Sequence, residues 1–355
     1  MIKLLIVDDS ALMRRQLTQI FEAAGDFQIR QARNGQEAVT ENRDFKPDVV
    51  TLDINMPEMD GLTALSHIMA ERPVAVVMVS SLTEKGALAT FEALNLGAVD
   101  FITKPGGTIS LSIDEIKVEL LAKVRSAAGA RLKGKVTPVK GMANRMREDR
   151  EKAARPAIVR RGVAGDGLVI IGVSTGGPST LEAILPVLPA DFPWPVLVAQ
   201  HMPAAFTKSF ADRLNNICPL RVTEASSPMP VEPGTIYIAK GGADMVVTTR
   251  VGKLTVLPKP ENSEFLWHPS VELLGRSVLE HCDPARVIAV MLTGMGNDGM
   301  ESFTEIKRRG GRTIAESKES CVVFGMPAEL IKNGGASLVM DAAKVATQVN
   351  VWVNR

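Results

Sequence analysis

The sequence predicts an α/β protein with two doubly wound parallel sheets. Short runs rich in Val, Ile and Leu alternate with segments whose apolar residues recur at helical spacing, and this alternation occurs on both sides of a basic stretch. A length of 355 residues is too great for one ordinary core and suits two domains. Parallel sheets are covered on both faces, which explains why most of the expected strands are apolar throughout.

The first domain is expected to occupy residues 1–125. Strands are expected at 2–7, 28–33, 48–53, 74–80 and 99–103, with helices between them, as at 11–24 and 85–97. The second of these strands, QIRQAR, is more polar than the others. A polar strand suits the centre of a covered sheet poorly, so we expect it at an edge.

Residues 126–167 differ in character from both flanking regions. They contain 11 Lys or Arg against 4 Asp or Glu, and the strand-like runs disappear. We interpret them as a solvated linker, partly helical around 142–154. The alternative is a basic arm that contacts an acidic partner or gates the neighbouring domain.

The second domain is expected to occupy residues 168–355. Buried parallel strands are expected at 168–173, 195–200, 286–293 and 312–316, with helices at 178–188, 205–216, 269–281, 299–309 and 327–333. The middle of the domain has three short strand-like runs separated by glycines, at 235–239, 245–249 and 253–258. We expect these runs to form an insertion that carries a small antiparallel hairpin.

The composition argues against several classes of protein. A formal net charge of +1 gives no general attraction to nucleic acid or to anionic membranes, and the second half has no basic recognition-helix pattern. The cysteines are too scattered for a disulfide framework or a zinc site: Cys218, Cys282 and Cys321. No apolar run is long enough to cross a bilayer and the N-terminus does not resemble a signal peptide. We expect a cytoplasmic monomer without membrane insertion.

Polar side chains follow four of the expected strands of the first domain: Asp8 and Asp9, Asp53, Ser80, and Lys104. Because the carboxyl ends of parallel strands lie at one edge of a sheet, these groups are expected to converge. Crowded carboxylates repel unless a cation lies among them, and Mg²⁺ prefers oxygen ligands. The set predicts a Mg²⁺ site at which an aspartate attacks a phosphoryl donor. The alternative is that these loop residues only cap helices.

These residues carry a family resemblance. IVDDSALMR, LDINMPEMDGL, MVSSLT and DFITKP resemble the receiver domain of two-component response regulators, over residues 1–125. The resemblance implies a flavodoxin-like fold, phosphorylation of Asp53, a Lys104 that pairs with the phosphoryl group, and a switch pair formed by Ser80 and Phe101. It also implies the Mg²⁺ ligands: Asp8, Asp9, Asp53 and the carbonyl of Asn55.

The second domain opens with GVSTGGP, directly after an expected strand. This stretch fits the G-x-S-x-G pattern, in which a sharp turn exposes a serine, and it also fits a glycine-rich phosphate cradle. A plain turn in which Ser174 or Thr175 caps a helix is a third interpretation. Among the histidines, His201 in VLVAQHMP alone follows a strong strand directly, which predicts that it shares a sheet edge with Ser174.

The glycine-rich turn at 294–299, GMGNDG, has two interpretations. Its spacing is that of a dinucleotide-binding turn, and Glu316 follows at about the distance of a ribose-binding acid. However, Asp298 would repel a pyrophosphate, and the dinucleotide fingerprint normally occupies the first turn of its domain. We favour the hypothesis that Asp298 orients His201 as a general base for Ser174, while the glycines let backbone N–H groups reach a developing oxyanion.

A second resemblance covers residue 168 to about 345. IGVSTGGP, AQHMP, HPSVELL, VMLTGMGNDGM and CVVFGMP resemble the chemotaxis protein-glutamate methylesterase, and a receiver in front is that family's arrangement. The resemblance implies a Rossmann-like catalytic domain with the triad Ser174, His201 and Asp298. It also places the oxyanion donor at the backbone of Met295, with Thr175 beside the nucleophile.

The same resemblance implies an activity. The family hydrolyses glutamate γ-methyl esters of chemoreceptors, releases methanol, and deamidates receptor glutamines through an acyl-serine. It implies Mg²⁺ in the receiver and no cofactor in the catalytic domain, with a chemotaxis histidine kinase as phosphodonor and methyl-accepting chemoreceptors as substrates. We expect the unphosphorylated receiver to cover the Ser174 cleft and phosphorylation to expose it.

Three residues depart from the family's usual pattern. Asp244 stands where His is usual, Glu272 where Asp is common, and Ser317 where an acid is often found. None of them belongs to the triad, and they leave receptor preference and the contacts with substrate open. Two other functions stay open: a receiver fused to a dinucleotide-binding oxidoreductase, and a receiver fused to a non-catalytic domain that only binds receptor helices.

Overall fold

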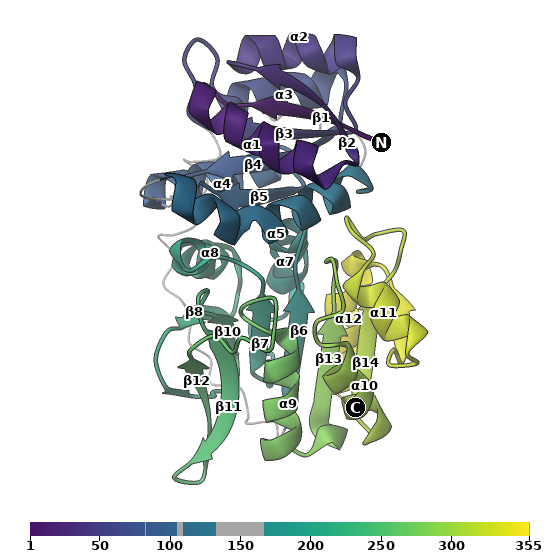
Figure 1. Ribbon diagram of the computed structural model, residues 1–355. Coiled ribbons are helices and arrows are strands. Elements are labelled where there is room, and N and C mark those ends of the chain that lie inside the picture. Colours follow the sequence, from purple (N-terminus) through teal and green to yellow (C-terminus); the bar gives the residue numbers. More distant parts are fainter. Residues whose placement is uncertain (82, 105–108, 133–166, 355) are drawn as a thin grey trace. The chain divides into compact units, whose positions relative to one another are not determined.

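The computed structural model describes residues 1–81, 83–104, 109–132 and 167–354 (Figure 1). The chain divides into two compact units, one within Met1–Lys140 and the other within Gly141–Arg355. The expected helical part of the basic segment, at 142–154, lies outside the described residues.

The first unit is a parallel sheet with the strand order β2-β1-β3-β4-β5. The expectation of a flavodoxin-like order is confirmed, because this order reverses beside the first strand. The polar strand β2 lies at the edge, as expected. The strands are β1 (Ile2–Val7), β2 (Phe27–Ala32), β3 (Val49–Asp53), β4 (Ala75–Ser80) and β5 (Asp100–Thr103). The helices are α1 (Ala11–Ala24), α2 (Gly35–Phe45), α3 (Gly61–Glu71), α4 (Glu84–Asn95) and α5 (Ile109–Ala128).

Local capping begins the helices of this unit where the strands end. The Ser10 hydroxyl accepts a hydrogen bond from the Met13 N–H and so caps α1, while the Asp8 carboxylate accepts from the Ser10 N–H. Helix α1 ends at Gly25, whose φ of 76° is the left-handed conformation that glycine adopts without strain. Capping is therefore a real role of Ser10, and it leaves the acids free to point into the sheet edge.

The second unit is a seven-stranded parallel sheet with the order β15-β14-β13-β6-β7-β10-β8. Its central strands are buried on both faces, which is the reason for their continuous apolar sequences. The strands of this sheet are β6 (Leu168–Val173), β7 (Val196–Gln200), β8 (Arg221–Ala225), β10 (Thr235–Ala239), β13 (Val287–Met291), β14 (Arg312–Glu316) and β15 (Leu338–Met340).

The expected hairpin insertion is correct only in part. Strands β11 (Asp244–Arg250) and β12 (Lys253–Lys259) form an antiparallel pair, and β12 also pairs with β9 (Met229–Pro230). The prediction that 235–239 belongs to this insertion is wrong, because these residues form β10 of the main sheet. All five residues of β10 are buried, whereas β11 and β12 each end in exposed residues. Strands β8 and β15 had no sequence-based prediction.

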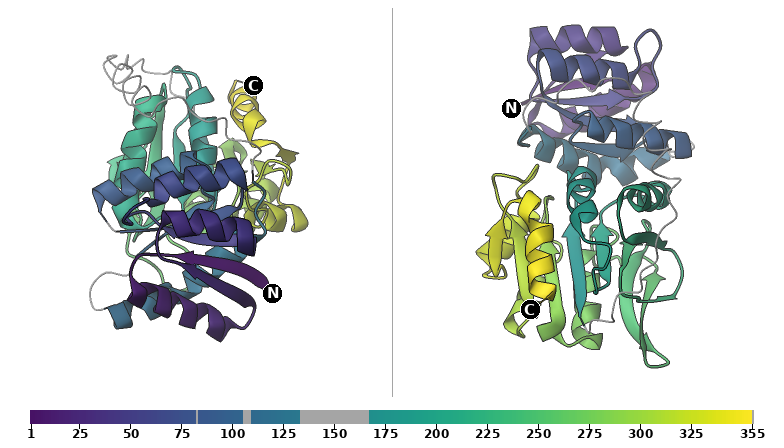
Figure 2. Two further views of the ribbon diagram at one scale, coloured as in Figure 1. Left: turned by 90° about the horizontal axis from the view of Figure 1, so that it is seen from above. Right: turned by 180° about the vertical axis from the view of Figure 1, so that it is seen from behind.

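Helices cover both faces of the seven-stranded sheet (Figure 2). The helices and short 3₁₀ turns are α7 (Gly177–Ile184), η1 (Leu185–Val187), α8 (Ala204–Ile217), α9 (Val271–His281), η2 (Pro284–Arg286), α10 (Met300–Arg308), α11 (Met326–Lys332) and α12 (Ala342–Val353). Helices α9, α10 and α11 join β11 in one core cluster. Helices α7, α8 and α12 pack together with η1, and the right-hand view of Figure 2 shows α12 in yellow at the front.

The path of the chain places a switch in strand order at the centre of this sheet. From β6 the chain goes to β7 and the strands beyond it, then returns to β13 on the other side of β6. In open α/β sheets, ligands bind beyond the carboxyl ends of the strands at such a switch. A ligand is therefore expected beside the residues that follow β6, β7 and β13.

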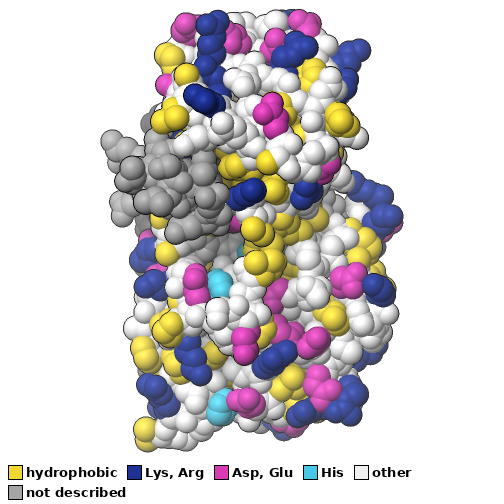
Figure 3. Space-filling view, viewed as in Figure 1, with side chains coloured by type: hydrophobic (Ala, Val, Ile, Leu, Met, Phe, Trp, Pro, Cys, Tyr) yellow, Lys and Arg dark blue, Asp and Glu magenta, His cyan; other side chains and the backbone are white. Residues whose placement is uncertain are grey.

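No helix in the described ranges is long and apolar enough to cross a membrane. In the view of Figure 3, basic and acidic side chains are interspersed on each unit, with no broad region of one sign. On this face the distribution agrees with the near-zero net charge of the chain.

Candidate active site

Three neighbouring strands bring the three expected site residues of the second unit to one edge. Ser174 follows β6, His201 follows β7, and Asp298 lies in the turn after β13; β6 is flanked by the other two strands. The His201 and Asp298 side chains are 5% and 7% exposed, and Ser174 is 3% exposed. The strand order thus places all three residues at one edge of the sheet, where a hydrogen bond joins the side chains of His201 and Asp298.

The Ser174 turn is held by backbone contacts on both sides. The Ser174 N–H donates to the Thr293 carbonyl at 3.0 Å, and the Gly177 N–H donates to the Ser174 carbonyl at 2.8 Å. Gly294 packs so closely that a Cβ there would lie 2.7 Å from the Ser174 Cβ and 2.6 Å from the Met326 sulfur. Only glycine fits at 294 without displacing the serine or its neighbours.

His201 Nε2 lies 2.8 Å from Asp298 Oδ2. An ionised carboxylate can only accept, so the proton of the neutral imidazole is on Nε2 and the lone pair is on Nδ1. His201 Nδ1 is buried and has no hydrogen-bond partner in the described structure. A buried basic nitrogen without a partner is suited to receive a proton from Ser174, although no hydrogen bond links the two side chains in this state.

The Asp298 carboxylate is fixed at the start of α9. It accepts from the Ser270 hydroxyl at 3.0 Å, the Val271 N–H at 2.7 Å and the Glu272 N–H at 2.9 Å, in addition to His201. Burial by itself would raise the pKa of Asp298, but His201 and these N–H groups outweigh it and hold the pKa below 3.8. The group is therefore a stable anion that can orient an imidazole and stabilise its charged form.

Two polar side chains join the loops that carry Ser174 and His201. Gln200 Nε2 donates to the carbonyls of Ser174 and His201, each at 3.0 Å. The Thr293 hydroxyl donates to the Thr175 carbonyl at 2.9 Å and accepts from the Val323 N–H at 2.9 Å. These buried contacts fix the serine turn against its two neighbouring strands.

The Gly294–Gly299 turn lies against the serine. Gly296 and Gly299 have φ values of 80° and 85°, which the turn requires and which glycine adopts readily. Met295 is 8% exposed, and no backbone hydrogen bond in the described chain uses its N–H. The role of the Met295 N–H as an oxyanion donor stays a prediction, with which the lack of a backbone acceptor among the described residues is compatible. Thr175 is 1% exposed, and its contact with Thr293 gives it a part in fixing the turn.

Trp267 forms one side of the imidazole environment. Its ring stacks on His201 with centroids 5.8 Å apart and an interplanar angle of 15°. A Cβ on Gly296 would lie 3.6 Å from the Trp267 Nε1. The indole therefore spans from the histidine to the glycine turn, where its π face favours an imidazolium.

Glu316 does not have the role that a dinucleotide site would need. It is fully buried, and its carboxylate accepts from the Thr293 N–H at 2.8 Å and the Ser320 hydroxyl at 2.9 Å. These contacts direct it into the protein, away from a ribose.

Burial raises the pKa of Cys218 to about 12 and of Cys282 to about 11, so neither offers a ready thiolate nucleophile.

The first unit brings its acids together at the carboxyl edge of its sheet. Among the described residues, Asp8, Asp9 and Asp53 each offer a carboxylate oxygen within 4.8 Å of the others. Lys104 Nζ lies 2.7 Å from Asp53 Oδ2 and 2.9 Å from Asp8 Oδ2. Burial and the charge of Asp8 raise the pKa of Asp53 against the opposing effect of Lys104. An excess of negative charge thus persists beside one lysine, and this donor set fits a hard divalent cation such as Mg²⁺.

The other expected receiver residues surround this edge. Ser80 is 1% exposed and its hydroxyl donates to the Gly86 carbonyl at 3.3 Å. Phe101 is 2% exposed, and Lys123 Nζ lies 5.2 Å from its ring centroid. Asn55 is exposed and its N–H lies 3.4 Å from Asp53 Oδ1.

The three residues that depart from the family pattern are interior residues. Asp244 is 1%, Glu272 6% and Ser317 7% exposed. The Glu272 carboxylate accepts from the Ser302 N–H at 3.0 Å, and the Ser317 hydroxyl donates to Asp341 Oδ1 at 2.5 Å. Each is engaged in a buried contact that organises a loop or a helix start.

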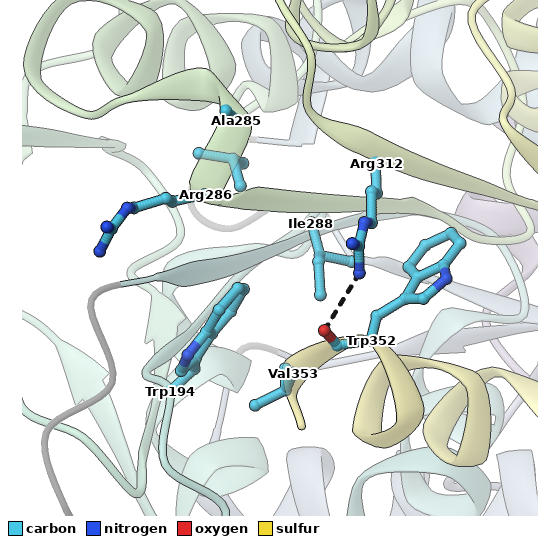
Figure 4. Close-up of a pocket in the computed structure, with 8 residues that line it drawn as sticks. Trp194, Ala285, Arg286, Ile288, Arg312, Trp352 and Val353 are labelled. Carbon is cyan, nitrogen blue, oxygen red and sulfur yellow. Dashed lines mark hydrogen bonds between the residues drawn. The ribbon is translucent and has the colours of Figure 1, made fainter. Parts of the chain in front are cut away.

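A cavity of about 360 Å³ lies elsewhere on the second unit (Figure 4). Trp194, Arg286, Arg312 and Trp352 line it, together with residues at the beginning of β13. Strands β13 and β14 begin here, so the cavity is at the amino edge of the sheet, opposite the Ser174 edge. The Arg312 guanidinium donates to the Trp352 carbonyl across it at 3.1 Å.

Sequence reasoning missed several residues of the site. Gln200 ends an otherwise apolar strand directly before His201, and that polar residue was the available signal. Ser270 was recognisable as a helix start before an apolar run. Nothing in the sequence indicated that Trp267 stacks on His201 or that Asp244 contacts the same segment.

Each of the two units matches a known protein family. Residues 4–113 match the response regulator receiver domain, and residues 169–349 match the CheB methylesterase. The protein-glutamate methylesterase/protein-glutamine glutaminase 3 of Rhodospirillum rubrum is 56% identical over 100% of this chain and 97% of its own length. The protein of the same activities from Caldanaerobacter subterraneus is 48% identical over 97% of this chain and 95% of its own.

A solved structure extends the comparison. The CheB methylesterase catalytic domain of Thermotoga maritima is 40% identical, with a TM-score of 0.51, and covers 54% of this chain and all of that one. The chain thus joins a response regulator receiver domain to a methylesterase domain. It belongs to the CheB methylesterase family.

Proposed function

We propose that this protein is a receiver-regulated protein-glutamate methylesterase and protein-glutamine glutaminase of chemotaxis. It removes methyl groups from glutamate γ-methyl esters on chemoreceptors, releasing methanol, and converts receptor glutamines to glutamates. The observation that carries the proposal is the His201–Asp298 hydrogen bond of 2.8 Å beside Ser174, with the partnerless Nδ1 of His201 buried at the same edge.

The acylation step uses Ser174 as nucleophile. Ser174 Oγ attacks the ester carbonyl carbon while His201 Nδ1 takes the hydroxyl proton. The Met295 N–H donates to the resulting oxyanion, a contribution worth about 10²- to 10³-fold in rate per donor in comparable sites. When the tetrahedral intermediate collapses, the C–O bond to methanol breaks and the imidazolium protonates the leaving alkoxide.

Deacylation repeats the chemistry with water. His201 Nδ1 takes a proton from water as the water oxygen attacks the acyl-serine, and the proton then returns to Ser174 Oγ. The product is a glutamate side chain. A glutamine substrate enters the same sequence with ammonia as the leaving group, so one site serves both reactions.

The receiver supplies regulation. A chemotaxis histidine kinase donates a phosphoryl group to Asp53, beside Lys104. Mg²⁺ held by Asp8, Asp9, Asp53 and the Asn55 carbonyl would neutralise charge as the phosphoryl group approaches. The phosphoryl group adds nearly two negative charges. This charge shifts the receiver from a state in which the Ser174 cleft is covered to one in which it is accessible.

Methanol release from methylated receptor tests these statements together. Wild type should release methanol, faster with a phosphodonor and Mg²⁺ present. Ser174→Ala should remove turnover, and Asp53→Ala should remove only the stimulation. Equal rates with and without phosphodonor would contradict the regulation and leave the esterase intact, whereas full activity of Ser174→Ala would contradict the mechanism and favour a domain that only binds receptors.

A further inference from the structure

The Asp244 carboxylate joins separate points of the segment that leads into α9. Asp244 begins β11 and is 1% exposed. Its Oδ1 accepts from the Ser270 N–H at 2.7 Å and lies 2.9 Å from His268 Nδ1, and its Oδ2 accepts from the Asn262 N–H at 3.1 Å. The carboxylate has no proton to donate, so Nδ1 carries the proton of His268.

Ser270 connects this carboxylate to that of Asp298. Its N–H donates to Asp244 and its hydroxyl donates to Asp298 Oδ1 at 3.0 Å, while the residue itself is fully buried. The next two N–H groups, of Val271 and Glu272, complete the cradle of Asp298. One residue therefore lies between two buried anions and fixes the spacing between them.

Loss of the Asp244 carboxylate would disturb the segment that holds Asp298. Without the Asp244 carboxylate, the buried Ser270 N–H and the partly buried Asn262 N–H would lose their acceptors, and the segment would shift to find others. Such a shift moves the Ser270 hydroxyl and the first turn of α9, which hold Asp298. A displacement of about 1 Å in catalytic geometry costs about 10²-fold in rate.

We propose that Asp244 is a positioning residue for the esterase and glutaminase reactions, which acts through Ser270 on Asp298 and so on His201. The proposal rests on the proposed function. Asp244 has no hydrogen bond to Ser174 or to His201 among the described contacts, so we expect its effect on the turnover step and not on substrate binding. The His268 Nδ1–H donates the second hydrogen bond that Asp244 Oδ1 accepts, and so holds this part of the segment against the carboxylate.

The test compares kcat and KM for methanol release by purified full-length protein. Asp244→Ala should lower kcat by about 10- to 100-fold with KM within threefold of wild type. Asp244→Asn keeps an oxygen that can accept from Ser270 and His268, and loses only the Asn262 contact, so its kcat should stay within about fivefold of wild type. Glu224→Ala is the control, because it removes a carboxylate that accepts from the Thr207 hydroxyl at 2.6 Å in the same unit and makes no described hydrogen bond to the segment that holds Asp298.

The outcomes separate this inference from the proposed function. If wild type releases methanol and Ser174→Ala does not, the function stands whatever Asp244 does. Wild-type kcat in Asp244→Ala, or an Asp244→Asn as slow as the alanine variant, would overturn the positioning role. If Asp244→Ala does not fold, Ser270→Ala decides: it removes the last contact in the route, and a wild-type kcat in that variant would overturn the proposal.

Discussion

Replacing Asp298 with asparagine hardly changes the shape of the side chain, but it should disturb the hydrogen bonds of the site more than any other change of this size. Each carboxylate oxygen accepts two hydrogen bonds: Oδ2 from His201 and Val271, and Oδ1 from Ser270 and Glu272. An amide has one oxygen and one NH₂ group, so in either orientation its NH₂ group faces two donors. Two of the four hydrogen bonds are lost.

The magnitude follows from these contacts. Each unsatisfied buried donor costs about 1–3 kcal/mol, which gives about 2–6 kcal/mol in all. If the NH₂ group faces His201, the imidazole must shift its proton to Nδ1, and it can no longer accept a proton from Ser174. That penalty lowers the free energy of unfolding. The wrong tautomer is what lowers kcat, and kcat should fall by about 10²- to 10⁴-fold, since the same change in a comparable triad costs about 10⁴-fold.

The assay is the steady-state release of methanol from methylated receptor. Asp283→Asn is the control, because Asp283 caps a 3₁₀ turn in the same unit with an ordinary hydrogen bond to the Ala285 N–H at 3.1 Å. The control should keep wild-type kcat. Asp298→Asn that folds and retains more than a tenth of the wild-type kcat would refute the assignment of Asp298 as the group that orients His201.

Four further predictions concern the glycine turn, the acidic site of the first unit, Trp267 and the charge of Asp298. Gly294→Ala should lower kcat by about 10²-fold, since its Cβ would lie 2.7 Å from that of the serine, whereas Gly129→Ala, with its nearest atom at 3.7 Å, should not. Chelation of Mg²⁺, or Asp53→Asn, should remove the phosphodonor stimulation of methanol release; stimulation that survives both would contradict the acidic site. Trp267→Leu should fold normally and lower kcat by about 2- to 10-fold, because the ring that stacks on the His201 imidazolium is lost. An unchanged kcat would count against that contact. Folding lowers the pKa of Asp298 from its ordinary value, so the charged carboxylate stabilises the protein above the unfolded-state pKa, and this stabilisation is lost as the pH falls through the lower folded-state pKa. Denaturant titration should therefore find Asp298→Asn less destabilising near pH 2 than at pH 7, and an equal loss at both would refute the lowered pKa.

Strand ends made much of the site predictable from sequence. Ser174, His201 and Asp298 each follow an apolar strand, and parallel strands deliver such residues to one edge whatever their separation along the chain. The same rule placed Asp8, Asp53 and Lys104 together. These predictions needed only the period of the strands and the direction of the sheet.

The remaining features depend on tertiary placement. Strand β10 was assigned to the hairpin because short runs between glycines look alike, and its membership of the main sheet is set by partners on β7 and β8. Gln200 and Asp244 act through side-chain hydrogen bonds, and these connect loops whose approach no local pattern encodes. The burial of Glu272 and Ser317 was not predictable either, because a single polar position carries no local sign of burial.

Partitioning of the acyl intermediate tests the central mechanism most directly. With hydroxylamine added, receptor methyl ester and receptor glutamine should yield hydroxamate and glutamate in the same ratio, because both pass through one acyl-Ser174. Different ratios for the two substrates, or turnover without hydroxamate, would contradict a shared acyl-serine.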